Sequence, residues 1–194
     1  MTTMPDLERR LIGDLVRDVA DSADAPGGGV VAGVTLAFAA GLVVKAARAA
    51  GDGWGDAGGT AAQATVLGRR ALAAGRLSGE AYGEATALMR TATGRGERDD
   101  DLAGALERSA QAPLELAGIA ADIAVLAADT AEDGGSAMRA EAVTACVLAE
   151  ACCVAAAHLV EINLGLLGGD VRLAQSADHV THARAARARV AQAS

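Results

Sequence analysis

The glycine-rich turn Pro26-Gly27-Gly28-Gly29 is the most specific local feature of this sequence that could bind a ligand. It leads directly into an apolar segment, residues 30–49, that is predicted to form a buried helix. Glycines allow positive φ angles and place no side chain in the way of a ligand. The free amides at a helix start favour an anion or a carboxylate. The alternative is a flexible turn that merely starts the helix, and composition alone gives both interpretations comparable weight.

A second candidate set lies on a long helix predicted over residues 136–167. Arg139, Glu150 and Glu161 follow one another at intervals of eleven residues, which returns them to nearly the same helix face. His158 precedes Glu161 by three residues and is within reach of its side chain. On so apolar a helix, these charges must face water, a partner or a pocket. If they are buried, their pKa values shift and they are candidates for acid–base catalysis.

Three acidic residues form a stripe at seven-residue spacing, which keeps them on one side of a predicted helix. A paired-carboxylate site could be drawn from this stripe. A solvated face opposite the apolar side of the same helix is the favoured interpretation. The three residues are Glu115, Asp122 and Asp129.

The sequence contains no convincing metal site. Asp178 and His182 are one helical turn apart, but a metal needs at least one further ligand, so an exposed helix with incidental histidines, His179 included, is favoured. The cysteines lack the spacing of a metal or disulfide framework. They are expected to be small buried hydrophobic residues in a reducing compartment. They are Cys146, Cys152 and Cys153.

These residues must be positioned by helices, because the chain shows no strand pattern of useful length. Its residues are 52% hydrophobic but only 2% aromatic, so the core must consist mainly of Ala, Val and Leu, which allow helices to approach closely. The fold class is all-α: one domain, residues 1–194, forming an antiparallel bundle of seven or eight helices. The helices are expected near residues 7–19, 30–49, 60–77, 79–92, 101–112, 114–131, 136–167 and 170–194.

Charge and hydropathy exclude several classes of partner. The formal net charge of −8 argues against nucleic acid or an anionic membrane surface. The apolar run at residues 30–44 is shorter than a membrane span, since Lys45 and Arg48 follow at once. The N-terminal residues do not form a signal peptide. A cytoplasmic protein without membrane or nucleic-acid partners is therefore expected.

The order of these elements resembles the formiminotransferase-cyclodeaminase family, which includes methenyltetrahydrofolate cyclohydrolases. The resemblance spans essentially the whole chain. It rests first on the turn Ala25-Pro26-Gly27-Gly28-Gly29 before an Ala/Gly-rich helix. It continues at Ala112-Pro113-Leu114-Glu115-Leu116-Ala117, and again at Glu161-Ile162-Asn163-Leu164 with Asp170 following. The glycine turn is the sharpest of these motifs.

The resemblance implies an all-helical subunit that pairs into a homodimer and holds a reduced folate. A tetrahydrofolate derivative would be the substrate or ligand, with hydrolytic or deaminating chemistry on a one-carbon unit at N5 and N10. Gly27, Gly28, Gly29 and Asn163 are the positions carried over as elements of the pocket.

Several positions depart from what the family usually carries. Val30 replaces a Ser after the glycines, and Ser78 stands near an expected Asp. The segment Gly51-Asp52-Gly53-Trp54 replaces a Lys-rich segment, which leaves Lys45 as the only lysine of the chain. Arg139-Ala140 stands where a Ser-Asp pair is usual. These changes remove the usual candidates for proton transfer on a folate amidine.

Three hypotheses follow, in order of preference. The first is a divergent enzyme that acts on a folate-borne one-carbon unit or a related nitrogenous small molecule, with specialised biosynthesis as a setting and Arg139, Glu150, His158 or Glu161 in the catalytic role. The second is an inactive relative that binds a folate or another small molecule. The third is a structural subunit whose pocket is filled by side chains. Fold alone does not decide between them.

Overall fold

The structure is a computed structural model that describes residues 10–21, 26–91, 104–164 and 169–192. Residues 104–109 are helical, and short 3₁₀ turns at Gly51–Gly53 and Ser136–Met138 precede the third and sixth helices. No strand occurs in these ranges, and the all-α prediction is confirmed. The α-helices are α1 (Ile12–Asp21), α2 (Gly28–Ala50), α3 (Ala57–Thr91), α5 (Gln111–Asp133), α6 (Arg139–Leu164) and α7 (Val171–Gln192).

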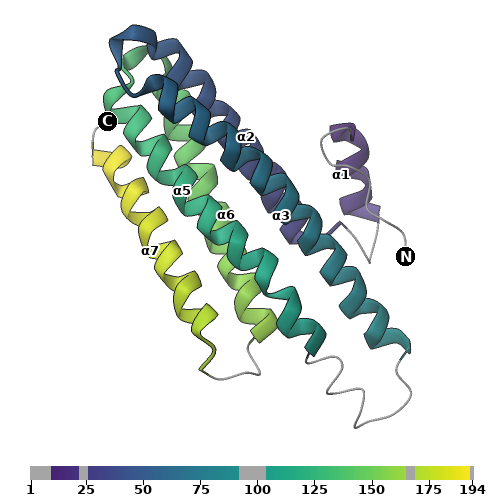
Figure 1. The fold of residues 1–194 in the computed structure, drawn as a ribbon. Coiled ribbons are helices and arrows are strands. Elements are labelled where there is room, and N and C mark those ends of the chain that lie inside the picture. The colour runs from purple at the N-terminus through teal and green to yellow at the C-terminus, as the bar shows by residue number, and fades with distance from the viewer. Residues whose placement is uncertain (1–9, 22–25, 92–103, 165–168, 193–194) are drawn as a thin grey trace.

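Four long helices form the body of the molecule in two layers (Figure 1). One layer pairs α2 with α6, the other pairs α3 with α5, and α7 packs against α5 and α6. The core between the layers is built mainly from alanine, as the composition predicts, with larger side chains such as Leu36, Leu116 and Ile123 fully buried. Small side chains bring the helix axes close together. The outer side of each layer is left to solvent or to a partner.

The sequence predicts a break between two helices at residues 75–79, and this prediction is wrong because α3 runs unbroken from Ala57 to Thr91. Gly75 lies directly against Gly33 of α2. A Cβ added at Gly33 would lie 2.8 Å from the Gly75 Cα and 2.6 Å from the Ala71 carbonyl oxygen. A glycine inside a helix costs about 1 kcal/mol relative to alanine, and close packing of the two helices offsets that cost. The glycine therefore marks a helix contact.

In place of the eight helical ranges expected, the described residues contain six α-helices and the helical segment at residues 104–109. The predicted helices over 60–77 and 79–92 are one helix. The predicted loop at residues 94–101 and the predicted helix end at 165–167 lie outside the described residues. The three cysteines are buried and free, as expected, and burial raises the pKa of each thiol to about 11 or 12.

Two described helices are long and apolar enough to cross a membrane by length and composition alone. They are the segment Gly28–Gly53, which begins with α2, and α6, each with a mean hydropathy of 2.0. About half of each apolar window is buried inside the bundle, 50% and 44% respectively. The core helix of a soluble protein passes the same test. The other half of each apolar window is exposed on the surface of the chain.

The first helix lies apart from the bundle (Figure 1). The sequence predicts an amphipathic helix here, and α1 has that character, but Leu15 is its only buried residue. Leu11, Ile12 and Val16 are each at least 60% exposed. The apolar side of α1 is therefore not packed into the core of its own chain.

Candidate functional site

A pocket of about 340 Å³ opens where the start of α2 meets α3 and the end of α6. Its volume is within the range of small-molecule sites in proteins. The pocket brings together the glycine turn and Asn163, which are far apart in the sequence. The lining residues are Pro26, Gly27, Gly28, Gly29, Val30, Ser78, Gly79, Tyr82, Ala85, Leu106, Ser109, Pro113, Leu159, Ile162 and Asn163.

The glycine turn begins α2 at this pocket. Gly27 is the N-cap residue, with φ −95° and ψ −170°, and no side chain caps the helix. Its carbonyl oxygen accepts the amides of Val30 (3.1 Å) and Val31 (3.3 Å). The amides of Gly28 and Gly29, in the first turn, have no acceptor further back along the helix. They provide a partial positive charge for an anionic group.

Gly29 of this turn is needed for space, whereas a Cβ at Gly27 or Gly28 would meet no close neighbour, and none of the three has an unusual backbone angle. The sequence raised positive φ as one use of the turn, but Gly51, Gly135 and Gly169 are the only glycines with positive φ in the described part of the chain. A Cβ added at Gly29 would collide with the side chain of Ser78 on α3. Any larger residue at position 29 would separate α2 from α3 at the pocket.

The polar side chains around the pocket are few and carry no formal charge at neutral pH. Ser78 is buried, Asn163 is half-buried, and Tyr82, the only tyrosine of the chain, is exposed at the rim. Ser109 is buried, and its Oγ donates to the Leu106 carbonyl oxygen at 2.8 Å. Among the lining residues the structure describes, none is an Asp, Glu, Lys, Arg or His. The walls are otherwise apolar, as in most small-molecule sites.

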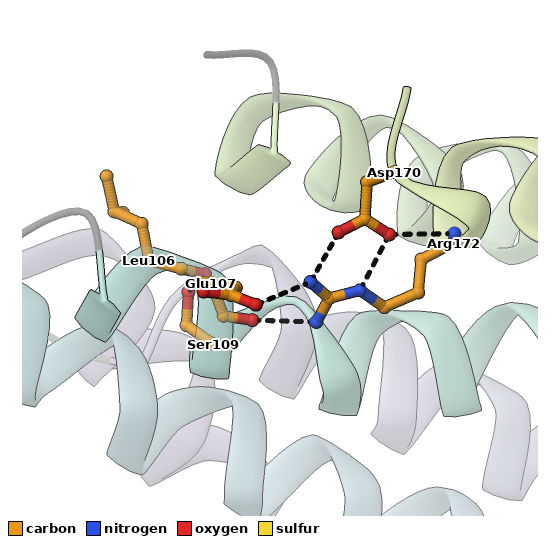
Figure 2. A network of polar contacts seen from close by, with 5 residues as sticks. All are labelled: Leu106, Glu107, Ser109, Asp170 and Arg172. Carbon is orange, nitrogen blue, oxygen red and sulfur yellow. Dashed lines mark hydrogen bonds and ion pairs between the residues drawn. The ribbon is translucent and has the colours of Figure 1, made fainter. Parts of the chain in front are cut away.

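Figure 2 shows the polar network that holds one wall of the pocket. The Asp170 carboxylate accepts from the Arg172 backbone amide (2.9 Å), Nε (3.0 Å) and Nη2 (2.6 Å), so Asp170 caps the start of α7. Arg172 also donates to the Glu107 carbonyl oxygen (2.9 Å) and carboxylate (3.4 Å). Its hydrogen bonds lower the pKa of Asp170 to about 2. Glu107 lies between Leu106 and Ser109, so the network fixes the segment that carries both lining residues.

The four charged residues proposed on the long helix do not line the pocket. Arg139 begins α6 at the end remote from the pocket, and its Nη1 donates to the Ala131 carbonyl oxygen at 2.5 Å. Glu150 is half-buried at mid-helix. His158 and Glu161 have 68% and 64% of their side-chain surface exposed, with 3.4 Å between Nδ1 and Oε2. Within the chain, these four residues are therefore not brought to the pocket at the glycine turn. Their catalytic role stays a prediction.

The acidic stripe on α5 forms ion pairs and a solvated face. Glu115 pairs with Arg70 at 3.3 Å, Asp129 pairs with Arg189 at 2.8 Å, and Asp122 is exposed. Among the residues that the structure describes, no group of three or more His, Cys, Asp or Glu side chains is arranged to hold a metal.

The acidic residue and the two histidines noted on α7 do not meet at one site. Asp178 and His182 are exposed, whereas the His179 ring lies against Gly118 of α5, 3.4 Å from the position of an added Cβ. This agrees with an exposed helix whose histidines are incidental.

Sequence reasoning missed several residues of the pocket. Ser78 was noted only as a departure from the family, yet it lies in the wall beside the glycine turn. Tyr82 and Ser109 carry no sequence signal that marks them, because helix packing alone brings them to the pocket. Leu159 and Ile162 read as ordinary apolar positions of α6.

A second, wider hollow of about 600 Å³ lies at the other end of α2. It is lined by residues of the turn after α2 and the start of α3, including Arg48, Asp52 and Trp54. Arg48 gives this hollow a cationic side chain, whereas the described lining of the first pocket has none. The two hollows lie at opposite ends of the same helix.

Comparisons with known proteins agree with the fold and with the family resemblance. A family model described as formiminotransferase-cyclodeaminase matches residues 11–182. The solved structure of formiminotetrahydrofolate cyclodeaminase from Thermotoga maritima superposes with a TM-score of 0.81 at 19% sequence identity. The match covers 95% of this chain and 96% of that one. No curated protein matches the chain. At this identity, the structural likeness shows the fold alone.

Proposed function

Because this chain belongs to the formiminotransferase-cyclodeaminase family, we propose that its pocket binds a tetrahydrofolate that carries a one-carbon unit. The ligand is 5,10-methenyl- or 5-formiminotetrahydrofolate, or a related nitrogenous small molecule, and the chain is a divergent cyclohydrolase- or cyclodeaminase-like enzyme. One observation carries the proposal. The two elements that the family resemblance implies for the pocket, the glycine turn and Asn163, line the same pocket from α2 and α6.

The pocket offers complementary groups to such a ligand. The uncapped amides of Gly28 and Gly29 suit a carboxylate or another anionic oxygen. The Asn163 amide both donates and accepts, which matches the edge of a pterin ring. The apolar walls, Leu159 and Pro113 among them, suit the flat rings of a folate.

The chemistry requires a proton to move on or off a nitrogen of the one-carbon unit. In cyclohydrolysis, a water molecule adds to the amidinium carbon, loses a proton, and one carbon–nitrogen bond opens. In cyclodeamination, N10 attacks the formimino carbon and ammonia leaves with an added proton. Both reactions need a positioned acid or base. The candidates nearest the pocket along α6 are His158, about one turn before Ile162, and Glu161, which directly precedes Ile162.

A second candidate function has its own support. The described lining residues include no ionisable side chain other than the Tyr82 hydroxyl. A site without a general acid or base binds a folate and does not turn it over. The alternative is therefore a folate-binding protein without catalytic activity.

The test is to mix the purified protein with 5,10-methenyltetrahydrofolate and to follow its absorbance for hydrolysis while measuring equilibrium binding. Turnover that is lost in His158→Ala or Glu161→Ala supports the enzyme. Binding without turnover supports the folate-binding protein. The absence of both would overturn the folate proposal.

A matched pair of variants locates the ligand. Asn163→Ala removes the amide at the pocket and is expected to weaken binding roughly five- to 150-fold, since a lost hydrogen bond to a desolvated ligand costs about 1–3 kcal/mol. Gln63→Ala removes an exposed amide from α3, outside this pocket, and is expected to leave binding unchanged. Equal effects of the two variants would contradict the assignment of the pocket.

A further inference from the structure

Ser78 of α3 is a buried serine whose hydroxyl is not bonded to its own helix. A serine or threonine inside a helix commonly donates to a carbonyl oxygen in the preceding turn. Ser109, Thr130 and Ser176 do so, at distances of 2.8, 2.7 and 2.9 Å. Ser78 is only 9% exposed, and its Oγ forms no hydrogen bond with any residue that the structure describes. Its hydroxyl is therefore available to a ligand.

This hydroxyl points at the start of α2. A Cβ added at Gly29 would overlap the Ser78 Oγ and lie 2.7 Å from the Ser78 Cβ, so the hydroxyl faces the backbone of Gly29 directly. Both residues line the pocket. Every side-chain nitrogen or oxygen that is sealed from solvent within the described ranges has a hydrogen-bond partner. The Ser78 Oγ has no such partner, so it opens to the pocket.

Two backbone amides lie beside this hydroxyl. The Gly27 carbonyl oxygen accepts from Val30 and Val31, which leaves the amides of Gly28 and Gly29 without an acceptor further back along α2. Gly29 is itself buried, which raises the cost of leaving its amide unpaired. Two amides and one hydroxyl therefore meet at one end of the pocket.

Close packing of α2 against α3 holds these three donors in place. Further into the bundle, a Cβ added at Gly33 would lie 2.8 Å from the Gly75 Cα. Ser78 follows Gly75 by three residues and Gly29 precedes Gly33 by four, so the same contact sets both residues in register. Donors that are fixed in advance reduce the ordering entropy that binding costs. The donor set is therefore preorganised for a small anionic group.

We propose that the amides of Gly28 and Gly29 and the hydroxyl of Ser78 bind a single carboxylate of the ligand, with Ser78 determining this specificity. Three neutral donors match a carboxylate, whose two oxygens offer about four acceptor sites. As a subsite for the glutamyl carboxylate of a folate, the inference rests on the proposed function. As a carboxylate site of the chain, it does not depend on that function.

The charge of the lining selects a carboxylate over a phosphate. No described residue that lines the pocket is Lys, Arg or His. A helix N-terminus provides about half a positive charge, and hydrogen bonds to an ionised acceptor add to it. A phosphate monoester carries nearly two negative charges at neutral pH, and burying the second charge without a counter-ion is costly. The donor set therefore favours a monoanion.

The carboxylate site also decides how the rest of the ligand lies. The ring of Tyr82, one turn after Ser78, lies at van der Waals distance, 3.9 Å, from a Cβ added at Gly27. From the other side, the Leu159 Cδ1 lies 3.8 Å from a Cβ added at Gly29. A flat group joined to the carboxylate meets the Tyr82 ring and the apolar Leu159 side chain. Aromatic carboxylates are therefore the ligand class expected here.

The first experiment follows the amide signals of Gly28 and Gly29 by NMR during titration with benzoate, benzamide and phenyl phosphate. Benzamide has the shape of benzoate without its charge, and phenyl phosphate carries a second charge. Benzoate is expected to shift both signals and to bind roughly tenfold more tightly than either comparison compound. Unshifted signals, or equal binding of benzamide, would overturn the carboxylate site. Tighter binding of phenyl phosphate would overturn the selection of a monoanion.

The second experiment tests Ser78 itself. Ser78→Ala is expected to weaken benzoate binding roughly tenfold, since a hydrogen bond to a charged group is lost, and to leave benzamide binding nearly unchanged. The ratio of the two affinities is the readout, because a purely structural role would change both alike. Ser176→Ala removes an equally buried hydroxyl from α7, outside the pocket, and is expected to change neither affinity. An unchanged ratio in Ser78→Ala would overturn the role of Ser78.

Titration with 5,10-methenyltetrahydrofolate separates this inference from the proposed function. Benzoate binding as expected without folate binding supports the carboxylate site and contradicts the proposed function. Equal folate binding by the parent and Ser78→Ala supports the proposed function and overturns the placement of a folate carboxylate at this site. Folate binding that weakens roughly tenfold in Ser78→Ala and not in Ser176→Ala supports both.

Discussion

The outer sides of the two helix layers differ in how many charged residues they carry. The outer side of the α3/α5 layer carries Arg69, Arg70 and Asp122, with an ion pair from Arg70 to Glu115. The exposed large apolar side chains of α3 and α5 are Val66 (52%), Leu77 (45%), Tyr82 (48%) and Val125 (38%). The outer side of the α2/α6 layer has no charged residue between Val31 and Lys45 of α2, and only half-buried Glu150 between Thr144 and His158 of α6.

Burial within the chain does not account for the apolar residues on the outer sides of α2 and α6, because those residues are exposed. Isolated apolar residues on a charged surface, as on α3 and α5, are normal for a solvated face. A contiguous apolar surface bounded by charges at both ends is typical of an interface. The predictions below test this contrast, beginning with the side of α2 that faces the core.

Gly33→Val should have the largest effect, because it acts on the inner side of α2. The added atoms would meet backbone of α3, the Ala71 carbonyl oxygen and the Gly75 Cα, and backbone cannot rotate away. Overpacking of this kind should lower the free energy of unfolding by about 3 kcal/mol. Urea titration followed by circular dichroism measures it. Gly41→Val, at a glycine of α2 with open space around its added Cβ, is the control, and an equal loss there would contradict the packing argument.

Phe38→Ala against Val66→Ala compares the two outer sides directly. If a second copy covers Phe38, its truncation should cost about 2 kcal/mol per chain, and the melting temperature of the parent should rise with protein concentration. Val66→Ala should change stability by no more than about 0.5 kcal/mol at any concentration. Thermal melts across a hundredfold range of concentration distinguish the two. A Phe38→Ala effect as small as that of Val66→Ala would remove the contrast.

Arg70→Ala tests the charged layer and should have a smaller effect. The ion pair with Glu115 is half exposed, and exposed pairs contribute about 0–1 kcal/mol. The loss should shrink further at high salt, because screening weakens such pairs. Denaturation with urea at low and high sodium chloride measures both. A loss above 2 kcal/mol would mean that this face packs against something other than solvent.

Asp170→Asn should have an effect that depends on pH. Hydrogen bonds from Arg172 lower the pKa of Asp170 to about 2, below its ordinary value of 3.8. The carboxylate therefore stabilises the folded chain above about pH 4, and that stabilisation is lost as the pH falls toward 2. The stability difference between parent and variant should be constant near neutrality and should vanish in acid. Asp122→Asn, at an exposed carboxylate, is the control and should show no such convergence.

Much of the fold follows from local pattern. The small-residue composition, the apolar periodicity and the turns at the glycine segments predicted an all-α bundle and placed the long helices α2, α5, α6 and α7 near their observed bounds. The glycine turn and Asn163 were found through motifs that resemble a family. These features depend on neighbours in the sequence or on a shared motif.

Other features depend on contacts between distant helices, which local pattern does not contain. Gly75 looks like a helix break until Gly33 is seen against it, because the same residue either ends a helix or lets two helices touch. Ser78, Tyr82 and Ser109 became pocket residues only when α3 and residues 104–109 were packed beside α2 and α6. Likewise, α2 and α6 are apolar nearly all round in sequence. Only the tertiary structure decided which half of each helix faces the core and which half is exposed.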